Sequence, residues 1–236
     1  MRLRANRHGA AARFQRAGEP PLDTPWRQAQ WCAVDLELTG LNPRSDEIVA
    51  IGAVPVSEGR LILGEAMYTL ARPDRPSRTP AVLIHKLRSA DLATAPSLSE
   101  AIERLLAVLA GRVPVFHTAV VERSFLGREL RRRRLRLPSD ADTEALGRAW
   151  LRERDGVAPS GLSLARLAAV LGQPGEDPHH ALGDALTTAQ AFIALASHLD
   201  AVAPQTVGSL QQVERELSGA ARRAGGDNRR TQPRSS

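Results

Sequence analysis

The stretch AVDLELTGLNPRSDEIVAIGAV, residues 33–54, decides the expected fold of this chain. It holds two apolar runs separated by TGLNPRSD, a segment rich in residues that form turns. A third apolar run, RLILGEAMYTL (60–70), follows after the short turn SEG. Connections this short favour antiparallel pairing, because parallel strands need a longer crossover. The sequence therefore predicts three strands at the start of a sheet: WCAVDLEL (31–38), EIVAIGAVPV (47–56) and 60–70.

The first of these strands carries two acidic residues, Asp35 and Glu37. Side chains alternate between the two faces of a strand, so both carboxylates point to the same face, with Cα atoms about 6.5–7 Å apart. Their neighbours Val34, Leu36 and Leu38 are apolar. Two carboxylates on an otherwise apolar strand are costly unless something compensates them, and a divalent cation would do so. The spacing alone also fits an edge strand whose polar face meets water.

From residue 80 onward the apolar residues recur at helical spacing. Ser97 or Ser99 would cap the first of these helices, and Gly111 would end it. VPVF (113–116) has the length and composition of a short buried strand. Strands followed by helices with a later strand predict a mixed sheet flanked by helices. The further helices are expected over about 120–134, 142–152, 163–172 and 179–199.

The 236 residues divide into a compact middle and two basic ends. We expect a flexible arm over 1–28, one domain over 29–200, and a largely disordered tail over 201–236 with a short helix at 208–217. Six arginines face two acids in the first 30 residues, and six face three in the last 36, so the middle is nearly neutral. Basic ends of this kind can hold phosphate backbones, and a solvated arginine-rich tail is the alternative.

Composition excludes several classes of protein. Cys32 is the single cysteine, so no intramolecular disulfide can form, and its apolar neighbours indicate a small buried side chain. The arginines near the N-terminus are not followed by an apolar stretch, which excludes a secretory signal. No segment has the roughly 18 unbroken apolar residues that a membrane helix needs. We therefore expect a soluble, cytoplasmic protein without a membrane partner.

Two more segments carry groups able to do chemistry. Glu122 follows the strand 113–116 near the start of a helix, where a surface glutamate is the ordinary alternative. His179 and Asp184 stand five residues apart at the start of the last helix, so both can face one pocket. Capping of that helix is the alternative explanation for the pair.

Taken together, these segments resemble the DEDDh exonucleases. The resemblance lies in AVDLELTGLNPRSDEIVAIGAV, VFHTAVVERSFLGREL (115–130) and HHALGDALTTAQAF (179–192), in this order, with IHKL (84–87) and DTEALGRAW (142–150) between them. It covers about residues 31–199. It implies an α/β, RNase H-like fold with a five-stranded mixed sheet flanked by helices on both faces.

The resemblance also implies a metal-dependent 3′–5′ exonuclease whose catalytic residues are Asp35, Glu37, Glu122, His179 and Asp184. The four carboxylates would bind two divalent ions, Mg²⁺ or Mn²⁺, which prefer carboxylate and phosphate oxygens. Two such ions can clamp both oxygens of an in-line displacement. His179 would act as the general base that takes a proton from the attacking water.

By the same resemblance, Thr39 and Gly40 would approach the terminal nucleotide through their backbone, and His85 would touch its sugar or base. We call the three matching stretches the first, second and third motifs, in chain order. The sequence departs from the family pattern at three places in the second motif, VFHTAVVERSFLGREL. Glu122 stands where the family usually has Asp, Val121 where it often has Phe, and Thr118 where it has Asn. The longer arm of Glu122 can shift the geometry of the site and lower the rate, and Val121 would stack less well on the terminal base.

The expected partner is nucleic acid with a free 3′ end, and DNA is slightly favoured over RNA because of the likeness to the epsilon subunit of DNA polymerase III. RNA trimming, and a binding module weakened in catalysis by Glu122, are the alternatives. A polymerase or a sliding clamp is a further candidate partner, because QTVGSL (205–210) faintly resembles clamp-binding peptides. The arginine run 131–134, with Arg128 and Arg136, either helps to hold a strand or forms a solvated helix face.

Overall fold

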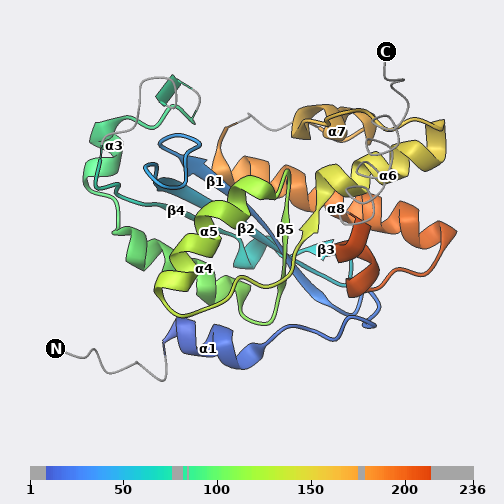
Figure 1. Cartoon of the computed structure of the whole chain (residues 1–236), viewed down its shortest axis with the longest axis horizontal. Helices are drawn as coiled ribbons and strands as arrows, with labels where there is room; N and C mark the ends of the chain where they lie inside the picture. The colour runs from blue at the N-terminus through green and yellow to red at the C-terminus, as the bar shows by residue number, and fades with distance from the viewer. Residues whose placement is uncertain (1–8, 76–81, 84, 175–178, 214–236) are drawn as a thin grey trace, which may run out of the picture.

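The structure is a computed structural model that describes residues 9–75, 82–83, 85–174 and 179–213. A mixed sheet forms its centre, and helices cover both faces (Figure 1). Across the sheet the strand order is β3-β2-β1-β5-β6, and β4 pairs with β2 beside β3. The strands are β1 (Gln30–Leu38), β2 (Ile48–Ser57), β3 (Arg60–Leu61), β4 (Met67–Leu70), β5 (Val113–Phe116) and β6 (Ala141–Asp142).

The predicted antiparallel start of the sheet is confirmed. β1 runs antiparallel to β2 and parallel to β5, and β5 runs parallel to β6. The strand expected over 60–70 is interrupted by a 3₁₀ turn, η1 (Leu63–Glu65), so β3 and β4 pair with successive parts of β2. The sheet is thus five positions wide, as the RNase H-like expectation required. β6 was not predicted, because two residues are too few to show a period.

Helices form two layers around this sheet. α4 (Leu98–Leu109) and α5 (Val120–Arg132) cover one face, and α8 (Ala181–Val202) packs on β1 and β2 from the other. α6 (Thr143–Asp155) and α7 (Leu164–Val170) pack against α8. Two shorter helices, α1 (Ala10–Ala17) and α3 (Ser89–Ala93), lie before and after the antiparallel strands in the chain.

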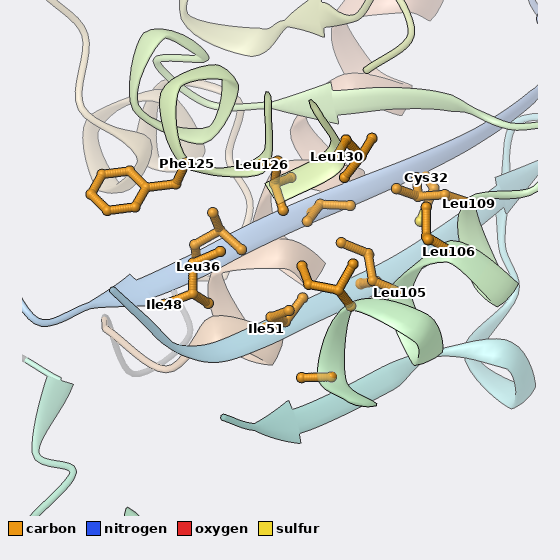
Figure 2. Close-up of a cluster of buried hydrophobic side chains, with 14 of the residues drawn as sticks. Cys32, Leu36, Ile48, Ile51, Leu105, Leu106, Leu109, Phe125, Leu126 and Leu130 are labelled. Atoms are coloured by element: carbon orange, nitrogen blue, oxygen red, sulfur yellow. The ribbon is translucent and has the colours of Figure 1, made fainter. Parts of the chain in front are cut away.

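The alternation of side chains along β1 sorts them between these two layers. Cys32, Val34, Leu36 and Leu38 lie in the core beneath α4 and α5, which Figure 2 shows as a continuous layer of apolar side chains. Burial raises the pKa of the Cys32 thiol to about 12, so this cysteine is an inert apolar side chain, as expected. Trp31 and Ala33 belong to the second core, beneath α8. Residues of odd number in β1 therefore face α8.

The N-terminal region differs from the expected flexible arm over 1–28. Residues 10–17 form α1, whose Phe14 is buried against α4, and Trp26 is 1% exposed in the second core. These apolar residues are too widely spaced to give a sustained period. They still contribute a large buried apolar surface to a chain that has few aromatic residues. Residues 1–8 lie outside the described residues.

The boundary expected at residue 200 also differs from the structure. α8 continues to Val202, and a helical segment runs over 207–213, so the described part of the helix expected at 208–217 is helical. Val207 and Leu210 are each 1% exposed, and the backbone N–H of Trp26 donates to Gln205. The apolar side chains of QTVGSL are therefore part of the core, which contradicts their use as a clamp-binding peptide. The remainder of the expected tail, 214–236, lies outside the described residues.

Within the described residues, no helix is both long enough and apolar enough to cross a membrane.

The packing of α1 predicts that Phe14→Ala lowers the free energy of unfolding by about 3 kcal/mol, because truncating a buried phenylalanine leaves a cavity. Gln15→Ala, on the exposed side of the same helix, should change it by less than about 0.5 kcal/mol. Chemical denaturation followed by circular dichroism measures both. Equal, small effects of the two substitutions would show that α1 does not contribute to the core.

Candidate active site

Three carboxylates converge where β1 meets the first turn of α8. Asp35 and Glu37 lie on the face of β1 that looks toward α8, and Asp184 comes from that helix. One oxygen from each residue lies within 4.8 Å of the other two. Glu37 is buried, and Asp35 and Asp184 are partly exposed, so the cluster borders on solvent. The acidic pair predicted on the strand, Asp35 and Glu37, therefore lies together with Asp184, which was predicted at the start of the last helix.

A glycine on the neighbouring strand allows this convergence. Gly52 of β2 is the register partner of Asp35. A Cβ atom at Gly52 would collide with the carbonyl group of Ala181, the first residue of α8, at a separation far shorter than any real contact. The start of α8 therefore rests directly on the backbone of β2. This close approach brings Asp184 to the pair on β1.

Burial and like charge both act against ionisation of the cluster. Burial raises the pKa of Asp35 well above its ordinary value, and the neighbouring carboxylates of Glu122, Asp184 and Glu37 raise it further. Burial, followed by the charge of Asp184, raises the pKa of Glu37 to about 7. The pKa of Asp184 is also raised by burial, although the backbone N–H of His179 opposes that rise. A positive ion among these oxygens would relieve the repulsion.

The donor set fits a hard divalent cation. All three groups are carboxylates, which suit Mg²⁺ or Mn²⁺, and the described cluster contains no thiolate that would favour zinc. The partial exposure of Asp35 and Asp184 leaves the cluster open to a substrate phosphate. The arrangement can therefore hold a metal ion and present it to a ligand.

Glu122 stands beside this cluster and outside the group of three. It lies in the first turn of α5, is 6% exposed, and its Oε2 has no hydrogen-bond partner among the described residues. Burial raises its pKa to about 8, and its charge is the largest electrostatic contribution to the raised pKa of Asp35. A buried carboxylate oxygen without a partner calls for a ligand or a water molecule.

The two adjacent histidines have different surroundings. The backbone N–H of His179 donates to Asp184 Oδ2 at 2.8 Å, and its φ of 66° is unusual for a residue other than glycine. The imidazole of His180 caps α8 through Gly183 and stacks on Tyr68 at 4.7 Å. His180 therefore has a structural role at the start of α8.

Among the residues expected at the terminal nucleotide, Thr39 and Gly40 follow the end of β1, whereas His85 and Val121 lie in helical segments. Thr39 and Glu47 exchange two hydrogen bonds that close the loop after β1. A Cβ atom at Gly40 would lie 2.5 Å from Asp46 Oδ2, so the carboxylate of Asp46 would have to move to admit a larger residue there. His85 is 5% exposed, and its Nε2 has no partner among the described residues. Val121 is half-buried and packs against the core beneath α4 and α5.

Sequence reasoning missed the residue that holds the second motif in place. The carboxylate of Asp142, at the end of β6, accepts hydrogen bonds from the backbone N–H groups of Thr118, Ala119 and Glu144. It therefore fixes the entry to α5 and also caps α6. Thr118 has a φ of 57°, a conformation that Asn tolerates better than a β-branched residue, which gives a physical reason for the usual Asn at this position.

Comparisons with known proteins find similar sequences over most of the chain. A family model described as RNase T, exonuclease, matches residues 32–192. A DNA polymerase III subunit epsilon-like protein from Rhodobacter capsulatus is 36% identical over 199 residues, which cover 83% of this chain and 28% of that protein. A PolC-type DNA polymerase III from Thermotoga petrophila is 30% identical over 174 residues, covering 72% of this chain and 12% of that protein. The chain thus spans less than a third of the length of these relatives.

Solved structures show the same fold. Exonuclease X in complex with 5′ overhanging duplex DNA has 23% identity and a TM-score of 0.57, with 78% of this chain and 98% of that chain covered. Escherichia coli exonuclease I in complex with a dT13 oligonucleotide has 15% identity and a TM-score of 0.62, with 74% and 42% covered. At these identities the likeness concerns the fold alone.

The contact at Gly52 predicts that Gly52→Ala moves α8 away from β2 and separates Asp184 from Asp35. We expect Mn²⁺ binding to be abolished and the protein to be destabilised by about 2 kcal/mol or more, since the new methyl group meets backbone and not a movable side chain. Gly64→Ala is the matched control, because nothing lies within 4 Å of its added Cβ. Calorimetric titration with Mn²⁺ and denaturation measure the two effects. Unchanged Mn²⁺ affinity in Gly52→Ala would contradict the role of this glycine.

The raised carboxylate pKa values predict a stability that depends on pH. Glu37 has an ordinary pKa of 4.5 and a folded value of about 7, so the folded protein binds more protons over this interval. The free energy of unfolding of the metal-free protein should therefore fall as the pH rises from 4.5 to 7. Asp35→Asn removes one charge from the cluster and should make the fall smaller, whereas Asp23→Asn, at an exposed site, should leave it unchanged. Chemical denaturation at several pH values in chelator tests this; identical slopes in all three proteins would contradict it.

Proposed function

This chain belongs to the RNase T exonuclease family, and from that membership we propose that it is a 3′–5′ exonuclease. It hydrolyses phosphodiester bonds at the 3′ ends of nucleic acids with the help of two divalent ions, Mg²⁺ or Mn²⁺. The observation that carries the proposal is the convergence of Asp35, Glu37 and Asp184 within 4.8 Å where the central strand β1 meets the first turn of α8. Holding three carboxylates this close costs free energy through their repulsion, and a bound cation would offset that cost.

Each acidic side chain has a distinct part in holding the ions. Asp35 and Asp184 would together hold one ion, and Glu37 would contribute to holding the second. Glu122, whose Oε2 is buried without a partner among the described residues, reaches the same region through its longer arm, directly or through water. When bound, such ions neutralise phosphate charge and stabilise the attacking and leaving oxygens.

His179 accepts the proton of the attacking water. Its main chain is fixed to Asp184 by the hydrogen bond from its N–H, so the base and one metal-binding carboxylate move as a unit. The imidazole of His179 is exposed, so a water molecule at the cluster can reach it.

The other predicted residues hold the terminal nucleotide. The backbone of Thr39 and Gly40 borders the cluster, because Thr39 follows Glu37 by two residues. The buried Nε2 of His85, without a partner among the described residues, is available for a hydrogen bond to the sugar or base. Val121 offers an apolar contact at the start of α5.

DNA is the favoured substrate, because the relative from R. capsulatus is named for the epsilon subunit of a DNA polymerase. RNA is the second candidate, since one of the similar structures is a 3′-exonuclease that recognises the 3′ end of a histone mRNA stem-loop. A DNA polymerase is the partner that the relatives' names suggest.

The test is digestion of matched single-stranded DNA and RNA of the same sequence, labelled at the 5′ end, with Mg²⁺, Mn²⁺ or chelator. We expect a ladder of progressively shorter labelled products that requires metal, with DNA cleaved faster than RNA. His179→Ala should lower kcat by roughly 10²- to 10⁴-fold, the usual contribution of a general base. His198→Ala, an exposed histidine stacked on Trp150, is the control and should keep its activity.

Cleavage that persists in chelator, or no cleavage of either substrate with either metal, would contradict the proposed function. Binding of both strands without cleavage, unchanged by Asp35→Ala, would favour a binding module in place of an enzyme.

A further inference from the structure

A pocket lies beside the loop that follows β1, on the face of the sheet covered by α4 and α5. It encloses about 460 Å³ and is distinct from the carboxylate cluster, none of whose residues lines it. Its walls are the end of the loop after β1 (44–48), the segment after β4 (72–75), the start of α4 (97–99), and two arginines of α5. Arg72 pairs with Ser97 across an isolated bridge, which joins two of these walls.

Five arginines and three acidic residues line the pocket. Arg128 and Arg132, from α5, already bind the buried carboxylate of Glu129. The guanidinium groups of the other three arginines make no hydrogen bond or ion pair within the part of the chain that the structure describes; these are Arg44, Arg72 and Arg75. All three are exposed. They therefore keep their donors for a ligand.

The acidic residues of the pocket are largely occupied. Glu47 Oε2 accepts the backbone N–H groups of Asp74 and Arg75 at 2.7 and 3.3 Å. Asp46 Oδ2 accepts the backbone N–H of Asn42 at 2.8 Å. The pocket thus combines three available guanidinium groups with two carboxylates, of Asp46 and Glu47, that accept backbone donors, and with the exposed carboxylate of Asp74. Arginine in this setting is suited to phosphate, because its planar donors match the phosphate oxygens.

The loop after β1 joins this pocket to the carboxylate cluster. Thr39 follows Glu37 by two residues and is hydrogen-bonded to Glu47, which lines the pocket. Strand geometry places Glu37, in the cluster, and Glu47, in the pocket, on the order of 10 Å apart. The cluster lies on the α8 face of the sheet and the pocket on the α4 and α5 face, so a strand passing over this loop meets both.

We propose that the pocket is a phosphate subsite for the substrate strand, upstream of the bond that is cut. Arg44, Arg72 and Arg75 hold a backbone phosphate of a strand whose 3′ end lies among Asp35, Glu37 and Asp184. The ligand is thus a phosphodiester of single-stranded nucleic acid, bound without regard to base sequence. This inference rests on the proposed function, and it adds a reason for the enzyme to prefer strands longer than a dinucleotide.

The test compares a 12-nucleotide single strand with a dinucleotide, which is too short to span both sites. The variant Arg44→Gln/Arg72→Gln should raise KM for the 12-nucleotide strand about tenfold and that for the dinucleotide by less than about twofold. The log–log slope of binding to the longer strand against salt concentration should become shallower by about 0.7 for each phosphate that the variant no longer neutralises. The double variant Arg60→Gln/Arg152→Gln, with the same change in charge at exposed positions outside the pocket, should resemble the wild type.

Several outcomes would overturn the subsite. One is an equal rise of KM for the two lengths; another is a pocket variant that matches the control variant. If inorganic phosphate inhibits the wild type through Arg44 and Arg72 while KM for the longer strand stays the same in the pocket variant, the pocket binds free anions and the strand proposal is wrong.

Failure of the proposed function is recognised separately. If the wild type cleaves nothing, fluorescence anisotropy of the labelled 12-nucleotide strand in chelator still compares the two double variants. Weaker binding by the pocket variant alone supports the subsite without catalysis, and equal binding by both variants rejects it.

Discussion

The close approach of α8 to β2 is the contact on which the site depends. The start of the helix rests on Gly52, and any side chain there would collide with the carbonyl group of Ala181. Because Gly52 pairs with Asp35 in the sheet register, the place where the helix comes nearest is also the place where the first motif carries its acids. Because Gly52 has no side chain, carboxylates from two segments that are distant in the sequence can lie in a single cluster.

That group is costly to the folded protein. Burial and mutual repulsion raise the pKa of Asp35, Glu37 and Asp184, and Glu122 adds a further buried carboxylate with an oxygen that has no partner among the described residues. The surrounding core offsets this cost through two apolar layers and through Asp142, which fixes the start of α5 and of α6. Functional sites in proteins commonly contain such locally unfavourable groups, and the rest of the fold compensates for them.

Much of this arrangement follows from local patterns in the sequence. The period of two in β1 predicts that Asp35 and Glu37 share a face, and the five-residue spacing places His179 and Asp184 at the start of one helix. The role of Gly52 does not follow, because a glycine in a strand does not reveal which element will approach it. The same holds for Phe14 and Trp26, whose spacing shows no period although both are buried. The pocket of arginines is likewise assembled from four separate segments, and only the tertiary fold brings these together.

The most direct test of the carboxylate site is anomalous diffraction at the manganese edge from a crystal soaked in Mn²⁺. We expect density between the carboxylate oxygens of Asp35, Glu37 and Asp184, with α8 still resting on Gly52. A second ion, nearer Glu122 and Glu37, should appear when a nucleotide with a free 3′ end is also bound. Manganese found elsewhere in the protein with none among these three carboxylates would contradict the central claim.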